Sequence, residues 1–372
     1  MCLENRRQNK NKNKGDIMSK RISISSTIDP HVHARDMNQE SVMTIMQTCI
    51  EAKKSGTDTV CLMPNTNPSI DNPGALERYK NLMKEAETAT GIKCFIWIAL
   101  TDENHKSVIH MLNDPYVVGV KIYPLKDDGS SVTTGAVGIK KFTSLMKLLA
   151  MMRRNEIYKP IAGHWEDPKL GHGIDSEVAA LKKLVLTAES YPEFSFTACH
   201  LTTAEGLKIV SNAQQNGTKI MIEFTPHHLW FCNEEVDTNN GLYKCFPPIK
   251  SCTDRKALRD FIKNNKNNHL VSIGSDTAPH NIADKEKENP NGGLATQQHI
   301  IPILLSLQKE LELTKKDIEN LTSINIANFL NIEKPKGISQ WDLSWGPDKR
   351  YYNNNKVLNP FKDEVLIGKK IS

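Results

Sequence analysis

Eight short apolar runs, separated by longer segments with helical periodicity, constrain the fold of this 372-residue chain more than any other feature. Each run is rich in β-branched or aromatic residues and is bounded by polar or turn-forming residues, which is typical of buried strands. The expected strands are residues 21–28, 58–64, 92–100, 117–123, 159–165, 194–200, 218–224 and 269–276. The expected helices between them are residues 40–55, 73–89, 139–154, 176–190, 203–215 and 253–265.

The gaps between these strands are long enough for right-handed crossovers, which predicts a parallel sheet. Eight strands with intervening helices favour an α/β fold of the (β/α)8 TIM-barrel type, and a doubly wound open sheet is the alternative. We expect residues 21–372 to form a single barrel domain. Within it, 281–293 should be a solvated loop, 295–312 and 314–330 helices outside the barrel, and 334–372 an irregular closing segment.

The formal net charge of +5 belongs almost entirely to the first twenty residues. Residues 1–20 carry six basic and two acidic side chains, a balance of +4, whereas the remainder carries 42 basic and 41 acidic residues. This Asn- and Lys-rich tail predicts a disordered, solvated extension, with a targeting segment as the alternative. Because the rest of the chain is nearly neutral, we expect no nucleic-acid partner.

The distribution of apolar residues and cysteines predicts a cytoplasmic protein. No apolar run approaches the roughly 20 residues that span a bilayer, so we expect no membrane association, and the N-terminus does not resemble a signal peptide. The eight cysteines show no CxxC pair or regular framework. Cys61, Cys94 and Cys199 lie in strand-like runs, where a free thiol packs as a small core residue, and a reducing compartment is expected.

Polar side chains occur where the expected strands end. In a TIM barrel the carboxyl ends of the strands form the catalytic face, so these side chains should meet at one mouth. They are His31, His33, Lys121, His164, His200, Asp276 and His280.

The HVH sequence at His31 and His33 has the spacing of a metal-binding pair. In an extended segment side chains alternate, so both imidazoles point to the same side. Histidine pairs in the core or on the surface are more common than ligands, but His164, His200 and Asp276 at equivalent strand ends favour a metal site. Zinc takes nitrogen and carboxylate ligands of this kind.

Lys121 interrupts the apolar run VVGVKIY. A buried lysine without a partner is costly, so one interpretation is a lysine that extends to the barrel rim. The other is that burial deprotonates the amine and carbon dioxide carboxylates it. The resulting carbamate could bridge two metal ions and offset their charge.

Seven segments in order resemble the dihydroorotase family of the amidohydrolase superfamily, in its single-domain short-chain type. They are DPHVHARD (29–36), MPNTNP (63–68), VKIYP (120–124), GHWED (163–167), CHLTT (199–203), TPHHL (225–229) and SDTAPH (275–280). The resemblance implies a two-metal hydrolase of cyclic amide C–N bonds. It also implies reversible cyclisation of N-carbamoyl-L-aspartate to (S)-dihydroorotate in de novo pyrimidine (UMP) synthesis.

The resemblance also implies roles for single residues. His31, His33 and Asp276 would hold one Zn²⁺, His164 and His200 the second, and carboxylated Lys121 would bridge the two. Asp276 would be the catalytic acid and base.

Arg35, Asn65 and His280 would bind the substrate carboxylate, because a guanidinium can hold a carboxylate bidentately. Residues 125–135 resemble a mobile loop over the substrate, with Ser130, Ser131, Thr133 and Thr134 as candidates, but a flexible linker has the same composition. The sequence leaves open whether cobalt or manganese replaces zinc. Related short-chain enzymes are dimers, so a homodimer is possible.

Other functions fit less well. Hydantoinases and allantoinases place a β-sandwich region before the barrel, and only about thirty residues precede the HxH here. A phosphotriesterase-like site gives no reason for Arg35. A non-catalytic barrel acting as a partner protein would be expected to have lost a ligand.

The remaining histidines have no predicted catalytic role. A structural role is expected for His227 and His228. No partner is predicted for the others, which are His105, His110, His172, His269 and His299. Trp165 stands where the family resemblance predicts glycine.

Overall fold

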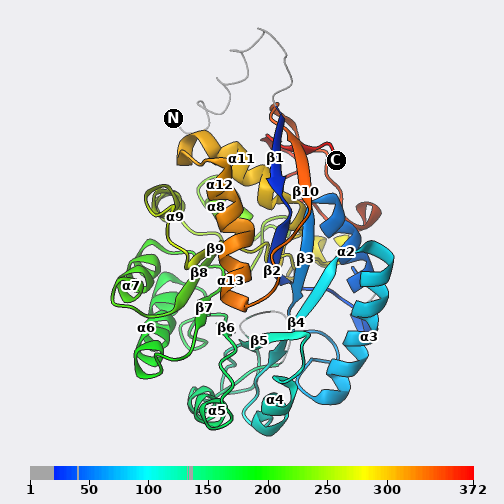
Figure 1. Cartoon of the computed structure of the whole chain (residues 1–372). Coiled ribbons are helices and arrows are strands. Elements are labelled where there is room, and N and C mark those ends of the chain that lie inside the picture. Colours follow the sequence, from blue (N-terminus) through cyan, green and yellow to red (C-terminus); the bar gives the residue numbers. More distant parts are fainter. Residues whose placement is uncertain (1–20, 40–41, 132, 134–136) are drawn as a thin grey trace.

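Eight parallel strands form a barrel at the centre of the computed structural model, which describes residues 21–39, 42–131, 133 and 137–372 (Figure 1). The strands follow each other in chain order, β2-β3-β4-β5-β6-β7-β8-β9. Their bounds are β2 Thr27–Val32, β3 Thr57–Leu62, β4 Lys93–Ala99, β5 Val117–Ile122, β6 Ile161–Gly163, β7 Phe196–Ala198, β8 Ile220–Phe224 and β9 Val271–Ile273. The backbone of His33 donates to the Thr277 carbonyl at 2.9 Å, which joins the first strand to the segment after the last. The predicted TIM barrel is confirmed.

Helices cover the outside of this barrel (Figure 1). Those between the strands are α2 Ile45–Lys54, α3 Pro73–Thr90, α4 His105–Met111, α5 Thr143–Arg154, α6 Ile174–Ser190, α7 Ala204–Gln215, α8 Pro226–Trp230 and α9 Cys252–Asn264. Local sequence sets their ends: Thr44 and Gln47 form a capping box at α2, and Gly91 ends α3 with φ +79°. The short helices α4 and α8 were not predicted, because five to seven residues show too little periodicity.

The core forms between the sheet and the apolar faces of these helices. On α5, Leu145, Leu148, Leu149 and Met152 recur at three- and four-residue spacing, and all are buried. Full burial of each such side chain contributes about 1.5–3 kcal/mol.

Three helical segments follow the barrel strands. They are α10 Ile282–Glu286, α11 Ile300–Leu311, and α12 Lys315–Glu319 with α13 Asn325–Leu330. The single helix predicted over 314–330 is divided, because Asn320–Ile324 form a π-helical turn. The prediction of a solvated loop over 281–293 is also wrong in part. Lys285 in α10 is buried and donates to the carbonyls of Lys244, Asn291 and Gly293 at 2.7–3.0 Å.

The expected first strand, 21–28, divides between two sheets. Only its end belongs to the barrel, as part of β2, whereas β1 Arg21–Ser25 pairs antiparallel with β10 Ile338–Asp342. Figure 1 shows β1 and β10 side by side. The break falls at Ser26, whose amide donates to the Gly337 carbonyl at 2.9 Å. His31 therefore lies inside the first barrel strand rather than after it.

The closing segment contains strands and is not irregular throughout, as had been predicted. Besides β10 it holds β11 Gly346–Pro347, β12 Val365–Leu366 and β13 Lys369–Lys370. β13 is the third strand of the β1–β10 sheet, and β11 pairs with β12. Two-residue strands have no recognisable alternation, so their sequence does not predict them.

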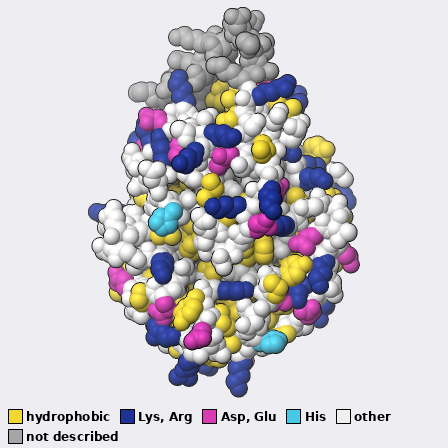
Figure 2. Space-filling model, in the orientation of Figure 1, with side chains coloured by type: hydrophobic (Ala, Val, Ile, Leu, Met, Phe, Trp, Pro, Cys, Tyr) yellow, Lys and Arg dark blue, Asp and Glu magenta, His cyan; other side chains and the backbone are white. Residues whose placement is uncertain are grey.

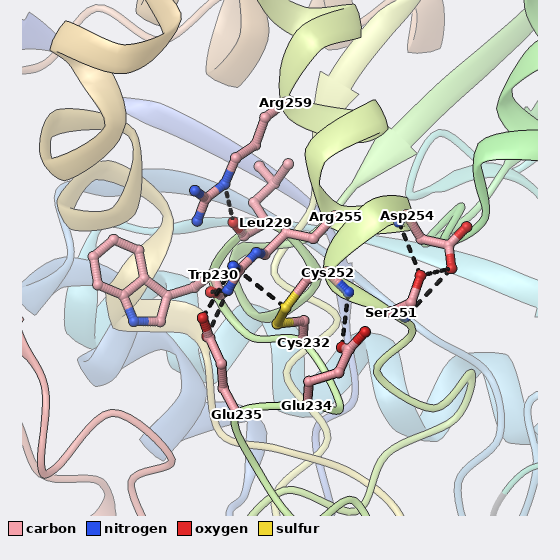
Figure 3. Close-up of a disulfide and its surroundings, with 10 residues drawn as sticks. All are labelled: Leu229, Trp230, Cys232, Glu234, Glu235, Ser251, Cys252, Asp254, Arg255 and Arg259. Atoms are coloured by element: carbon pink, nitrogen blue, oxygen red, sulfur yellow. Dashed lines mark hydrogen bonds and ion pairs between the residues drawn. A yellow bond between two sulfur atoms is a disulfide. The ribbon is translucent and has the colours of Figure 1, made fainter. Parts of the chain in front are cut away.

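Cys232 and Cys252 form a disulfide, which the expectation of a reducing compartment did not predict (Figure 3). Their Cα atoms lie 4.9 Å apart, although twenty positions separate them in the chain, so spacing alone gives no indication of the bond. Beside the disulfide, Arg255 donates to Glu235 and to the Trp230 carbonyl, both at 2.7 Å. The predicted free, buried thiols are confirmed for Cys61, Cys94 and Cys199.

The distribution of surface charge and the hydrophobicity of the helices agree with the predictions from the sequence. On the face shown in Figure 2, basic and acidic side chains are interspersed, as the near-neutral balance beyond residue 20 predicts. None of the helices in the described ranges is both long and apolar enough to cross a membrane. The predicted disordered tail, residues 1–20, lies outside the described residues.

Candidate active site

A cavity lies at the carboxyl ends of the barrel strands. Seven of the nine predicted site residues line it: His31, His33, Arg35, Asn65, His164, His200 and Asp276. The other two are buried beside it: Lys121 is in β5, and His280 follows Asp276 by four positions. The barrel topology thus brings together residues from six separate segments.

His31, His33 and Asp276 form one half of the site. The Nε2 atoms of both histidines lie 3.3 Å from Asp276 Oδ1. Each Nδ1 atom has a different partner: Glu223 Oε1 lies 2.7 Å from that of His31, and Asn65 Oδ1 lies 2.6 Å from that of His33. Histidines that bind metals are commonly oriented in this way, with one ring nitrogen held and the other free for the ion.

His164 and His200 form the other half. His164 Nδ1 lies 3.1 Å from His200 Nε2, and His164 Nε2 lies 2.6 Å from Glu166 Oε2. His200 Nδ1 is buried and has no hydrogen-bond partner in the described part of the chain. The rings of His31 and His200 are 5.4 Å apart, so the two halves adjoin.

Lys121 is fully buried, with 0% of its surface exposed. Its Nζ donates to Cys199 Sγ at 3.2 Å, and across residues 21–39, 42–131, 133 and 137–372 it forms no ion pair with a carboxylate. The interpretation that it extends to the barrel rim is therefore wrong. What remains is a buried amine that interacts with His31, His33 and His200, an arrangement that is costly unless a modification or a counter-charge compensates it.

Burial sets the protonation of this site. It lowers the pKa values of His31, His33 and His200 well below the ordinary value, with the positive charge of Lys121 contributing in each case. These imidazoles are therefore neutral at physiological pH, which is the form that binds metals. Burial also raises the pKa of Glu223 to about 7.

Two site residues have left-handed backbone conformations. The φ angle is +39° at His200 and +48° at Asp276, and neither residue is glycine. Such conformations persist only where the surrounding structure imposes them, and they concentrate at functional sites. The donor set, the neutral imidazoles and the unpartnered His200 Nδ1 together fit divalent metal ions.

Arg35 lies on the wall of the same cavity. It is only 2% exposed, and burial lowers its pKa to about 10, so it remains a cation at neutral pH. Its Nη1 donates to the Asn65 carbonyl at 3.5 Å, but Nε has no hydrogen-bond partner, and Arg35 forms no ion pair among the described residues. His280 Nε2 lies 3.0 Å from the Gly292 carbonyl, and burial lowers the pKa of His280 to about 3.

Several residues of the site were not predicted. Glu223 and Glu166 hold His31 and His164, and the cavity wall also includes Tyr123 and Phe246. Glu223 could have been recognised, because a carboxylate inside the apolar run TKIMIEF is as unusual as Lys121 in its own strand. Glu166, Tyr123 and Phe246 gave no comparable signal, because each occupies a position that also suits a loop or core residue.

Three histidines for which no partner was predicted do have one. His105 Nε2 lies 3.0 Å from the Ser144 carbonyl, and His299 Nε2 lies 3.0 Å from Asp348 Oδ2. His172 Nδ1 lies 2.9 Å from Glu166 Oε2, and its ring stacks on Phe246 with 4.5 Å between the ring centroids. The expected structural roles agree with the contacts of His228, whose ring nitrogens lie 2.8 Å from Thr225 Oγ1 and 3.1 Å from the Pro247 carbonyl.

Trp165, which stands where the family resemblance predicts glycine, is held by a hydrogen bond. Its Nε1 donates to the Thr197 carbonyl at 2.8 Å, and its ring covers Gly163, where a Cβ atom would lie 2.5 Å from the ring.

The predicted mobile loop, residues 125–135, is described in part. Thr133 lines the cavity, and Ser131 Oγ lies 3.1 Å from the Thr133 hydroxyl oxygen. Thr134 lies outside the described residues.

The model of the family described as "Amidohydrolase family" matches residues 24–339. A dihydroorotase of Lactiplantibacillus plantarum is 26% identical over 345 residues, covering 85% of this chain and 76% of that protein. A dihydroorotase of Staphylococcus aureus (strain Mu50) is 25% identical over 369 residues, covering 92% of this chain and 83% of its own. The predicted resemblance to dihydroorotases is confirmed.

Two solved structures share the fold. Dihydroorotase of Saccharomyces cerevisiae, in complex with 5-fluoroorotic acid, superposes with a TM-score of 0.81 at 18% identity, covering 95% of this chain and 98% of that one. L-Hydantoinase (dihydropyrimidinase) of Arthrobacter aurescens superposes with a TM-score of 0.81 at 16% identity, covering 94% of this chain and 82% of that one. At these identities the superpositions report the fold alone and do not separate the two activities. Because the family match spans most of the barrel and its site, the chain belongs to the amidohydrolase family.

Proposed function

We propose that this protein is a dihydroorotase, which reversibly cyclises N-carbamoyl-L-aspartate to (S)-dihydroorotate. The observation that carries this proposal is Arg35, a buried cation without an ion pair in the described structure, on the wall of a cavity that also presents metal-type donors. Burying an unpaired charge is expensive, so the arrangement favours a ligand that brings an anion. Dihydroorotate carries a carboxylate on the same ring as its hydrolysable amide.

We infer that two zinc ions bind here. His31, His33 and Asp276 would hold one, His164 and His200 the other, and Lys121 would bridge them as a carbamate. Carboxylation would join the uncharged form of an amine to carbon dioxide with release of one proton, so that the Lys121 side chain becomes an anion. When bound, the metal pair supplies a hydroxide nucleophile at neutral pH and stabilises charge that develops on the carbonyl oxygen.

The protein's own residues would then act on the substrate. Arg35 binds the carboxylate bidentately, with Asn65 and His280 adding contacts, and so fixes the ring in the cavity. Asp276, at the cavity wall, accepts the proton of the attacking group and returns it to the departing amide nitrogen. Glu223, Asn65 and Glu166 keep the histidine rings in their orientations.

The alternatives lack a specific observation in their favour. A hydantoinase or allantoinase acts on an uncharged ring, which would leave Arg35 buried without a counter-ion. A non-catalytic partner protein has no need for six intact ligand positions, and all six converge here.

The proposal also covers the domain organisation, the location and the assembly of the protein. We place residues 21–372 in one catalytic domain acting in the cytoplasm on a small-molecule substrate, in de novo pyrimidine synthesis. Residues 1–20 would be a solvated tail, and a homodimer is the assembly that the resemblance suggests.

The test is turnover of L-dihydroorotate by the purified chain, followed by its ultraviolet absorbance, with metal content measured on the same sample. Hydrolysis with about two zinc ions per chain, as expected for a bridged catalytic pair, would support reaction and cofactor together. Turnover of hydantoin or allantoin, with none of dihydroorotate, would replace the proposed substrate.

A further inference from the structure

Tyr123 lines the catalytic cavity, although no role has been assigned to it. It follows β5 directly and is only 2% exposed. Its side chain packs in a small cluster with Ala99 and Val137. Its carbonyl accepts from the amide of Ile139 at 2.9 Å, and Gly138 approaches so closely that a Cβ atom there would lie 2.1 Å from this oxygen. The backbone of Tyr123 is thus fixed by neighbouring residues, and its ring is packed in the interior.

The hydroxyl of Tyr123 is buried and has no hydrogen-bond partner among the described residues. A buried hydroxyl without a partner is costly, and most tyrosines in protein cores have one. A tyrosine hydroxyl carries one donor hydrogen, so this group can donate to a ligand. An unsatisfied donor that is held rigidly on a cavity wall indicates a partner in the ligand.

Its surroundings indicate which part of a ligand that partner is. Tyr123 lines the same cavity as Arg35 and Asp276 and interacts electrostatically with both, and Lys121 Nζ lies 5.3 Å from the centroid of its ring. A carboxylate that accepts two hydrogen bonds from a guanidinium can still accept more, because its two oxygens together have about four lone-pair sites.

We propose that the Tyr123 hydroxyl donates a hydrogen bond to the substrate carboxylate held by Arg35, and that Tyr123 is therefore a substrate-binding and specificity residue. This proposal rests on the proposed function of the site. It deepens that function, because a cyclic amide without a carboxylate leaves both the cation and the hydroxyl unpaired. A site with buried polar groups of this kind rejects ligands that cannot pair with them.

The experiment uses the zinc-loaded full chain and the substitution Tyr123→Phe, which removes one oxygen and keeps the ring. Loss of a hydrogen bond to a charged group should raise the KM for L-dihydroorotate about ten- to hundredfold, with kcat within about threefold. The dissociation constant of orotate, a planar ligand with the same carboxylate, should rise by a similar factor. The ligand-free variant should melt no lower than the wild type, because the lost hydroxyl had no partner.

Tyr116→Phe is the control. The Tyr116 hydroxyl already donates to Glu87 Oε2 at 3.3 Å, and Tyr116 directly precedes β5, at the end of the strand away from the cavity, so its removal should leave KM unchanged. The proposal is wrong if Tyr123→Phe leaves both constants unchanged. It is also wrong if kcat falls at constant KM, which would place the hydroxyl on the reacting carbonyl.

A structural role for the hydroxyl would have a different signature. Tyr123→Phe would then melt at a lower temperature and would bind orotate and dihydrouracil, which lacks the carboxylate, with equal losses. That result overturns the proposal as well. If the proposed function is wrong, the wild-type protein itself will neither turn over dihydroorotate nor bind orotate. That result would also exclude the proposed role of Tyr123.

Discussion

Glu223 on β8 holds His31 on β2, with 2.7 Å between Glu223 Oε1 and His31 Nδ1. Both side chains are buried, so water does not compete for this contact. The same carboxylate oxygen lies 3.2 Å from the backbone amide of His200, which donates to it. One carboxylate therefore orients residues from both halves of the candidate metal site.

We expect Glu223→Gln to lower the zinc affinity of the protein about 10- to 100-fold, the usual effect of removing a group that orients a metal-binding histidine. Competition with a chromophoric chelator measures this affinity. Glu205→Gln, on the exposed side of α7, is the control and should bind zinc like the wild type. An unchanged affinity in Glu223→Gln would mean that the His31 contact has no bearing on metal binding.

Arg35→Gln should act on substrate binding. We expect KM for L-dihydroorotate to rise about 100-fold or more, because a bidentate charged contact is lost, while kcat changes much less. Steady-state kinetics at saturating zinc measure both constants, with Arg154→Gln on the exposed end of α5 as control. A collapse of kcat at constant KM would contradict the carboxylate-binding role.

Lys121→Met should separate catalysis from folding. We expect turnover to be lost, because no carbamate can form, while the metal-free variant is at least as stable as the metal-free wild type. A buried amine without a counter-charge is destabilising, and methionine fills a similar volume. Urea denaturation of both metal-free proteins measures the free energy of unfolding. A variant that turns over at near wild-type rate would contradict the bridging role.

His299 should make the protein less stable in mild acid. Burial lowers its pKa to about 4, although the carboxylate of Asp348, 3.0 Å away, opposes the shift. The unfolded chain takes up this proton near pH 6.5 and the folded chain only near pH 4. The unfolded state therefore binds more protons between these values, and stability falls as pH falls, by about 3 kcal/mol for this group.

Chemical denaturation between pH 4 and 7 tests this expectation. In His299→Gln the slope of unfolding free energy against pH should be smaller by up to one proton, even if the variant is less stable at pH 7. An identical slope in both proteins would show that His299 does not cause the loss.

Reduction of the Cys232–Cys252 disulfide should lower the melting temperature. Closing a loop of this length restricts the unfolded chain and contributes about 3 kcal/mol. Cys232→Ser should match the reduced protein and should not respond to dithiothreitol. Alkylation of both cysteines in the unreduced, unfolded chain would contradict the disulfide itself.

The sequence predicts the site more completely than it predicts the fold around it. His31, His33, His164, His200 and Asp276 were recognisable because each polar residue adjoins an apolar run, and barrel topology brings such positions together. The residues that orient these ligands were harder to predict. Glu166 is two positions from His164, but its contact with the His164 ring depends on the direction of its side chain, which a sequence does not show.

The errors in the fold prediction have a common physical cause. Residues 21–28 read as one strand, because an apolar run does not reveal that its two halves pair with different neighbours. Lys285 read as part of a solvated loop, because its charge suggests solvent, whereas three backbone carbonyls satisfy it in the interior. In each case the decisive partner is distant in the chain.

The pairing of β1 with β10 also determines the order in which the molecule can be completed. Arg21 pairs with Asp342, so the ribosome releases one strand of this small sheet long before the other. Throughout most of synthesis β1 is an edge without its partner, next to a barrel whose strands can already pair with their neighbours in sequence. The sheet that joins both ends of the described structure therefore cannot form until nearly all of these residues have been synthesised.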